Sequence, residues 1–229
     1  MKIRLDSLLE GAERAEGTAV IIDVYRAFTT ASVALSRGAD KIVQVSEVHE
    51  ALDLRRRGLA DICVGEVGGI MPEGFDFGNS PFQLSRADVE GKTIAQRTSA
   101  GTSGVTAATA AGGIYAAALV NAAATARAIL RDGPELVTIV AMGADGLARA
   151  DEDEQCAMYI RNLLQGAAPD RAAVRSLVLS GEQSRKYENP KLPHFHPKDR
   201  DIALRIDEFP FAIAVRPEEG LLVARAEVV

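Results

Sequence analysis

One segment of the sequence concentrates polar side chains among residues that restrict the backbone. The 71–81 segment reads MPEGFDFGNSP, and its polar members are Glu73, Asp76, Asn79 and Ser80. Because proline fixes φ and glycine admits conformations that other residues avoid, the segment is predicted to be a rigid loop. A loop with two carboxylates, an amide and a hydroxyl is typical of a binding site. The alternative is a solvated loop in which Asp and Asn form turns.

Further polar residues follow the expected strands, where open α/β sheets collect their ligands. They are Asp23, Arg26, Thr29, Thr30, Glu66, Arg97, Thr98, Ser99, Gly101, Thr102 and Asp145. Hydroxyls, glycine amides and a helix N-terminus favour a phosphate, and Arg26 adds a charge-assisted contact. Carboxylates suit Mg²⁺, which takes its other ligands from water and substrate. Together these residues predict metal-assisted phosphoryl chemistry.

Each of these residues also has a purely structural interpretation, which the sequence leaves open. Asp23 could cap the following helix, Thr29 and Thr30 could belong to its first turn, and 98–102 could be a simple turn. Glu152 and Asp153 would then compensate a helix dipole. His194 and His196 would lie in a solvated loop. Several familiar signatures are missing, among them the P-loop lysine, a cysteine followed by arginine six residues later, and Gly-x-Ser-x-Gly.

The elements that must position these residues alternate along the chain. Short β-branched runs predict strands at 18–24, 41–45, 61–64, 92–96, 114–120 and 136–142, and near 211–215 and 221–224. Helices are expected at 29–35, 47–59, from 102 to about 111, and at 122–130, 150–164 and 172–179. This order predicts an α/β fold with a layered, largely parallel or mixed sheet flanked by helices. We expect residues 1–229 to form a single catalytic unit, and a division of this unit into two α/β lobes that meet near residue 90 stays open.

Composition narrows the function classes. The 229 residues are 47% hydrophobic and 25% charged, which is ordinary for a soluble globular protein. The net charge of −6 argues against nucleic-acid binding. Because there is no apolar run of about 20 residues and no signal-peptide pattern, we expect no membrane contact and a cytoplasmic location. A homodimer is the default assembly.

Four motifs together resemble the 2-phosphosulfolactate phosphatase family, the Mg²⁺-dependent acid phosphatases of coenzyme M biosynthesis. They are IDVYRAFTT at 22–30, Gly65-Glu66, PEGFDFGNSP at 72–81 and RTSAGT at 97–102, with Asn121, Glu152-Asp153, Cys156-Ala157 and Asp207 in support. Tyr25 and Phe28 replace the commoner Leu and Thr. Ser99-Ala100 replaces the frequent Thr-Asn, which removes an amide near the expected phosphate site.

The resemblance implies a hydrolase that uses Mg²⁺ to cleave a small anionic phosphomonoester, namely 2-phosphosulfolactate, to sulfolactate and phosphate. On this hypothesis Asp23, Glu66 and Asp76 hold the metal or orient water, and Arg26 acts with them in catalysis. The residues expected to bind phosphate or substrate are Arg26, Thr29, Thr30, Asn79, Thr98, Ser99, Gly101 and Thr102. The rival hypotheses are a non-catalytic binder of a phosphorylated or sulfonated metabolite, and an assembly protein.

Overall fold

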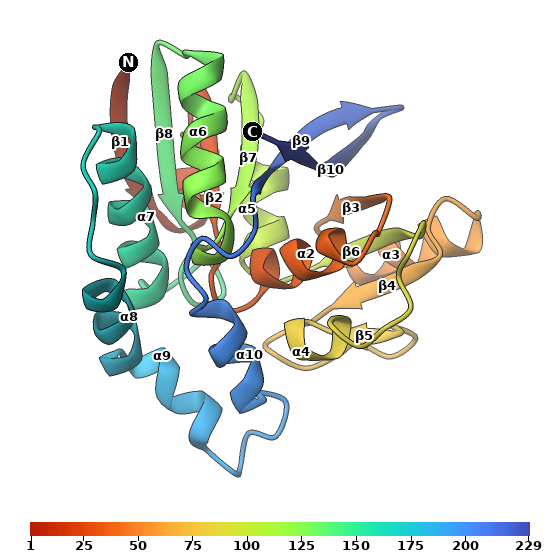
Figure 1. Ribbon diagram of the computed structural model, residues 1–229. Helices are drawn as coiled ribbons and strands as arrows, with labels where there is room; N and C mark the ends of the chain where they lie inside the picture. The colour runs from red at the N-terminus through yellow and green to blue at the C-terminus, as the bar shows by residue number, and fades with distance from the viewer.

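A computed structural model describes all residues, 1–229, and shows one ten-stranded mixed sheet flanked by helices (Figure 1). The expected α/β fold is confirmed. The strands are β1 (Lys2–Ser7), β2 (Thr18–Ile22), β3 (Lys41–Val45), β4 (Ile62–Gly65), β5 (Phe77–Gly78), β6 (Thr93–Arg97), β7 (Gly113–Ala117), β8 (Leu136–Ala141), β9 (Phe211–Glu218) and β10 (Leu221–Val228). Their order in the sheet is β1-β8-β2-β7-β9-β10-β3-β6-β4-β5.

The helices lie between these strands. The α-helices are α1 (Leu8–Glu13), α2 (Ala27–Ser36), α3 (Val48–Arg56), α4 (Pro81–Leu84), α5 (Gly101–Ala107), α6 (Ala122–Asp132), α7 (Asp151–Leu164), α8 (Arg171–Ser180), α9 (Glu182–Arg185) and α10 (Pro197–Ala203). Two 3₁₀-helices, η1 (Leu119–Asn121) and η2 (Lys186–Glu188), complete the set. None of the helices combines the length and the apolarity that crossing a membrane demands.

The sheet consists of two parallel groups joined by the C-terminal hairpin. The first group is β1-β8-β2-β7 and the second is β3-β6-β4-β5, while β9 pairs antiparallel with β7 and β10 with β3. Glu219 and Gly220 connect β9 to β10 with φ of 51° and 81°, the left-handed conformations that suit a tight hairpin. Residue 90 lies between β5 and β6, inside the second group, and the division into two lobes stays a prediction.

Helices α2 and α5 pack between the two groups. Helix α2 contacts β7 and β10, and α5 contacts β2, β3, β6 and β7. Every residue of α2 except Ser36 is buried, as expected for a helix enclosed on all sides. In Figure 1 the strands of the first group run nearly vertically, whereas β4 and β6 lie across the view. The bent sheet therefore brings the carboxyl ends of β2 and β8 toward those of β4 and β6.

Several element boundaries differ from those predicted. The helix expected to reach residue 111 ends at Ala107, because the chain turns so that the N–H of Gly112 reaches the carbonyl of Gly17 at 2.7 Å. The strand expected over 114–120 ends at Ala117 and gives way to η1. Segment β1–α1 was not anticipated, and neither were α9, η2 and α10 near the proline-bearing stretch 183–198.

Candidate active site

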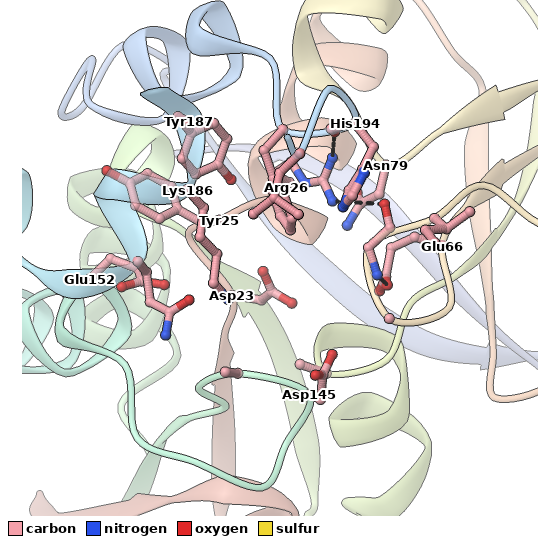
Figure 2. A pocket seen from close by; sticks show the side chains of 18 of the residues that line it. Asp23, Tyr25, Arg26, Glu66, Asn79, Asp145, Glu152, Lys186, Tyr187 and His194 are labelled. Carbon is pink, nitrogen blue, oxygen red and sulfur yellow. Dashed lines mark hydrogen bonds between the residues drawn. The ribbon is translucent and has the colours of Figure 1, made fainter. Parts of the chain in front are cut away.

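A cavity of about 420 Å³ opens where the two parallel groups approach each other (Figure 2). Its walls come from the turn after β2, the loop after β4, the ends of the segments after β5 and β6, the loop after β8 with the start of α7, and residues 183–195. The polar side chains that line it are Asp23, Tyr25, Arg26, Glu66, Asn79, Asp145, Glu152, Gln183, Lys186, Tyr187 and His194. The expected convergence of strand ends is therefore present, although its membership differs from the predicted set.

Asp23 follows β2 and joins the two halves of the fold. Its Oδ1 accepts the N–H of Ala27 at 3.0 Å, and its Oδ2 accepts the N–H of Gly101 at 2.9 Å. The carboxylate thus holds the starts of α2 and α5 while lining the cavity. Burial, with a smaller contribution from the charge of Glu66, raises the pKa of Asp23 to about 6. Asp23 therefore both caps the start of α2 and lines the cavity.

Glu66 faces the same cavity from the end of β4. Its Oε1 accepts the N–H of Ser99 at 2.6 Å, and its Oε2 accepts the N–H of Gly69 and the Oγ–H of Ser99. With 6% of its surface exposed, Glu66 is buried to nearly the same degree as Asp23. The two carboxylates come from opposite halves of the sheet, and backbone N–H groups fix both.

Glu152 is a third buried carboxylate at the cavity, and its place there was not predicted. It is the second residue of α7 and directly precedes Asp153, whose oxygens accept the N–H groups of Val24 and Gly143 at 2.7 and 2.8 Å. No other residue donates a hydrogen bond to the Glu152 carboxylate. Burial raises its pKa to about 7, and the charge of Asp23 contributes. An acidic run after a buried strand that neighbours β2 was the signal that could have identified it.

The charges that line the cavity do not balance. Four carboxylates, Asp23, Glu66, Asp145 and Glu152, face two cations, Arg26 and Lys186. No group of three or more His, Cys, Asp or Glu side chains is arranged to hold a metal ion. The hard carboxylate oxygens nevertheless fit Mg²⁺, which uses one or two protein carboxylates and completes its shell with water and phosphate.

Asp76 does not join this group, which corrects the expectation that it lies with Asp23 and Glu66. Its Oδ2 accepts the N–H of Cys63 and a guanidinium N–H of Arg55, both at 2.8 Å. The next residue, Phe77, pairs with Val64 in the β5–β4 ladder. Because successive side chains along a strand alternate in direction, this register leaves Asp76 toward α3 and away from the cavity.

Four of the predicted hydroxyl ligands are buried away from the cavity, and three of them form internal hydrogen bonds. Thr29 donates to the carbonyl of Val24 at 2.8 Å, and Thr30 is buried without a partner. Thr98 and Thr102 bond each other, with the N–H of each donating to the Oγ1 of the other at 2.7 and 3.0 Å. Their hydroxyls stabilise the β6–α5 junction, as the structural alternative held.

Ser99 and Gly101 donate hydrogen bonds to the carboxylates of the cavity. The Oγ of Ser99 donates to Glu66 at 3.2 Å, and the N–H of Gly101 is taken by Asp23. Neither residue lines the cavity, whereas their neighbour Ala100 does. At position 100, the asparagine that is frequent in the family is therefore replaced by alanine, whose methyl group lies at the cavity wall.

Arg26 is buried, with 4% of its surface exposed, and it binds two walls of the cavity together. Its Nη1 donates to the carbonyl of His194 at 2.7 Å, and its Nη2 donates to that of Gly69 at 3.3 Å. The guanidinium lies 4.6 Å from the ring centroid of Phe195 and 4.0 Å from Asp199. That Arg26 also contacts phosphate stays a prediction.

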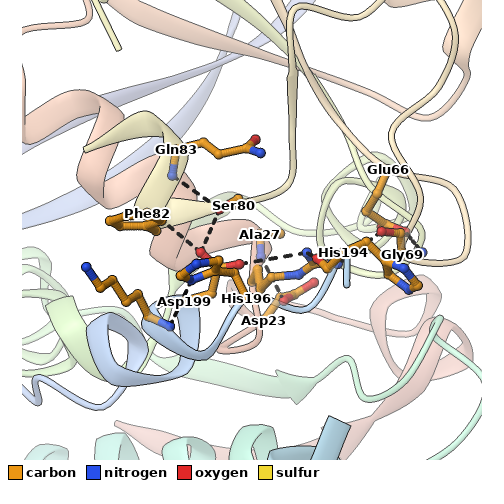
Figure 3. Close-up of polar contacts among 12 residues, drawn as sticks. Asp23, Ala27, Glu66, Gly69, Ser80, Phe82, Gln83, His194, His196 and Asp199 are labelled. Carbon is orange, nitrogen blue, oxygen red and sulfur yellow. Dashed lines mark hydrogen bonds and ion pairs between the residues drawn. The ribbon is translucent and has the colours of Figure 1, made fainter. Parts of the chain in front are cut away.

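The 71–81 segment reaches the site only through its end (Figure 3). The Oγ of Ser80 donates to Asp199 at 2.6 Å, and the N–H of Phe82 donates to the same oxygen at 3.0 Å. Asn79 lines the cavity and has a buried amide oxygen without a hydrogen-bond partner. The segment is thus anchored to α10, and Asn79 is its contribution to the cavity.

An aromatic cluster fixes the wall formed by residues 183–195. The ring of Tyr25 lies 5.0 Å from that of Tyr187, which in turn lies 5.5 Å from Phe195. The Tyr25 hydroxyl is 3.0 Å from Ser184 Oγ. Tyr25, which departs from the commoner leucine, therefore ties this wall to the turn after β2.

Comparison with known proteins gives a consistent result. A family model described as 2-phosphosulpholactate phosphatase matches residues 5–190. A protein from Thermoplasma volcanium is 32% identical over 188 residues, covering 82% of this chain and 84% of its own. One from Carboxydothermus hydrogenoformans is 38% identical over 165 residues, covering 72% and 68%, respectively. One from Deinococcus radiodurans is 37% identical over 153 residues, covering 66% and 63%. Each is named "Probable 2-phosphosulfolactate phosphatase".

Proposed function

Because this chain belongs to the 2-phosphosulfolactate phosphatase family, we propose that it is a Mg²⁺-dependent phosphatase that hydrolyses 2-phosphosulfolactate to sulfolactate and phosphate. One observation carries the proposal beyond the names of its relatives. Asp23 and Glu66, from opposite halves of the sheet, face one cavity as buried carboxylates held by backbone N–H groups. Such fixed oxygens beside a cavity for a small molecule are typical of a phosphoryl-transfer site.

Asp23 and Glu66 are the proposed protein ligands of Mg²⁺, and Asp76 is left out because it pairs with Arg55. Bound Mg²⁺ would supply charge neutralisation for the substrate phosphate. Each of the two carboxylates already accepts backbone N–H groups, which keep it in one orientation. Its remaining lone pairs are available to the metal. Without a cation, four carboxylates at the cavity would repel an anionic ester.

Glu152 is the proposed proton acceptor. It lies at the cavity, no other residue donates a hydrogen bond to it, and burial raises its pKa to about 7. A carboxylate with such a pKa suits general-base catalysis near neutral pH. In the reaction the water oxygen forms the new bond to phosphorus while the ester P–O bond breaks, with its electron pair passing to the departing sulfolactate oxygen. The proton lost by the attacking water passes to Glu152, and the departing oxygen takes a proton from solvent water. Asn79 offers an amide to the bound ester.

A non-catalytic binder of the same class of metabolite is the second candidate. It is favoured by Ala100 at the cavity wall, where the family commonly has an amide.

Phosphate release separates the two candidates. Purified protein with 2-phosphosulfolactate should release phosphate with added Mg²⁺ and lose this activity in EDTA. Glu66→Gln should lower kcat about 100-fold or more while the protein stays folded, because the metal would lose a charged ligand. Saturable binding of the ester without phosphate release, with and without Mg²⁺, would establish the binder instead.

A further inference from the structure

Residues 183–195, from α9 to the turn before α10, form one wall of the cavity. They include Gln183, Lys186, Tyr187, Leu192, His194 and Phe195. Figure 2 draws Lys186 and Tyr187 on one side of Asp23, with Asn79 and Glu66 on the other. Lys186 and Tyr187 therefore lie across the cavity from Glu66, one of the carboxylates proposed to hold the metal, whereas His194 and Phe195 lie beside Gly69 and Glu66.

We propose that Lys186 is the specificity-determining residue of this site and binds an acidic group of the substrate other than the phosphate. The inference rests on the proposed function, because it assigns a partner to the part of the ester that is not cleaved. The substrate class is then a phosphomonoester with a sulfonate or carboxylate close to the ester carbon.

Lys186 is a cation without a carboxylate partner at the cavity. It belongs to η2, lines the cavity, and forms no ion pair, whereas Arg200 nearby pairs with Glu188 at 2.7 Å. Its ammonium lies 5.6 Å from the centroid of the Phe195 ring. This cation–π contact orients the Lys186 side chain and leaves the N–H donors of the ammonium free. An ammonium with three free donors at a cavity wall suits a sulfonate or carboxylate.

The other positive groups at the cavity are not available for this task. The guanidinium of Arg26 donates to the carbonyls of His194 and Gly69 and stacks on Phe195. Burial lowers the pKa of His194, with Arg26 contributing, so His194 is mainly uncharged at neutral pH. Lys186 therefore carries the one charge at the cavity that is free to attract a second anionic group.

Lys186 also lies within electrostatic range of Glu152, which provides the competing explanation. If its role were to tune Glu152, replacing it would change kcat for every ester alike. If it binds an acidic group, replacement would raise KM and would do so only where that group is present. The KM and kcat effects on two substrates thus distinguish the two roles.

The experiment compares 2-phosphosulfolactate with phenyl phosphate, which has no second acidic group. Lys186→Gln should lower kcat/KM for 2-phosphosulfolactate about 10- to 100-fold, mainly by raising KM. The same variant should change kcat/KM for phenyl phosphate less than about threefold. Lys186→Arg should restore much of the loss. Lys191→Gln, an equal charge change at an exposed position of the same stretch, is the matched control. Equal losses on both esters would overturn the inference.

Failure of the proposed function would look different. In that case wild-type protein releases phosphate from neither ester, and binding of 3-sulfolactate is measured by calorimetry instead. The inference expects Kd to rise at least about tenfold in Lys186→Gln and to stay unchanged in Lys191→Gln. Equal Kd values in Lys186→Gln and wild type, or no binding to wild type, would overturn it.

Discussion

Asp23 and Gly101 are in direct contact across the two parallel groups of the sheet, with the N–H of Gly101 donating to Oδ2 of Asp23 at 2.9 Å. A Cβ atom at residue 101 would lie 2.7 Å from the Cβ of Ala27 and 3.0 Å from that same oxygen. Only glycine allows this approach. The position of the Asp23 carboxylate thus depends on the absence of a side chain on the first residue of α5.

Gly101→Ala should therefore damage the site more than the fold. The added methyl group has to displace Asp23 or Ala27, so we expect kcat to fall at least about 30-fold. Overpacking of this kind costs about 1–3 kcal/mol of stability. Phosphate release and urea unfolding measure the two effects. Gly113→Ala is the control, because nothing lies within 4 Å of a Cβ built there. Full activity in Gly101→Ala would contradict the proposed position of Asp23.

Replacement of two aspartates tests which of them belongs to the site. Asp23→Asn keeps the side-chain shape but removes the charge proposed to hold Mg²⁺, so kcat should drop about 100-fold or more. Asp76→Asn should keep kcat within about threefold, because Asp76 pairs with Arg55 outside the cavity. Since that ion pair is partly exposed, its loss should change stability by about 1 kcal/mol or less. Comparable activity losses in the two variants would place Asp76 back in the site.

Replacement of Arg26 tests its role as a brace. Lys cannot reproduce a planar guanidinium that donates to the carbonyls of Gly69 and His194 and stacks on Phe195. Arg26→Lys should therefore lower the free energy of unfolding by about 2–4 kcal/mol, because buried acceptors and Asp199 lose their partner. It should also raise KM for every ester. Denaturant unfolding and steady-state kinetics measure this, with the exposed Arg205→Lys as control. Unchanged stability would mean that Arg26 is not a brace.

The sequence allowed prediction of those features that depend on local pattern. Buried β-branched runs indicated most strands, and Asp23 and Glu66 were recognised because each follows such a run. What it could not show was how distant strands meet. The insertion of β10 beside β3 depends on a pairing between residues 180 positions apart, such as Val223 and Val43, and this pairing joins the two parallel groups.

The errors in the predicted site arise because the sequence does not show in which direction a side chain points or which group it pairs with. Asp76 and Asn79 lie three residues apart in one loop, yet only Asn79 reaches the cavity, because the two-residue strand β5 fixes which way each side chain points. Thr98 and Thr102 satisfy each other, which their spacing allowed but did not require. Lys186 lies in a stretch without helical or strand periodicity, so no pattern indicated its direction.

The buried carboxylates predict an unusual dependence of stability on pH when no metal is bound. Burial raises the pKa of Asp23 from 3.8 to about 6 and that of Glu152 from 4.5 to about 7. The folded state therefore holds protons more tightly than the unfolded state between these values. The stabilisation from these groups is complete below about pH 4 and is lost as pH rises through about 6 to 7. In EDTA, we expect the free energy of unfolding to decrease by about 1–3 kcal/mol from these groups as the pH rises from about 4 to about 7.

Comparison with Asp23→Asn isolates this effect from that of other carboxylates, some of which are stabilising when ionised. The difference in unfolding free energy between wild type and Asp23→Asn, measured by urea at pH 4.5 and pH 8 in EDTA, should favour wild type more at the lower pH. Mg²⁺ should stabilise wild type more at pH 8, where the carboxylates are ionised, and should have little effect on the variant. A pH-independent difference would show that Asp23 is not held in a buried, repulsive cluster, and the proposed metal site would lose its main physical support.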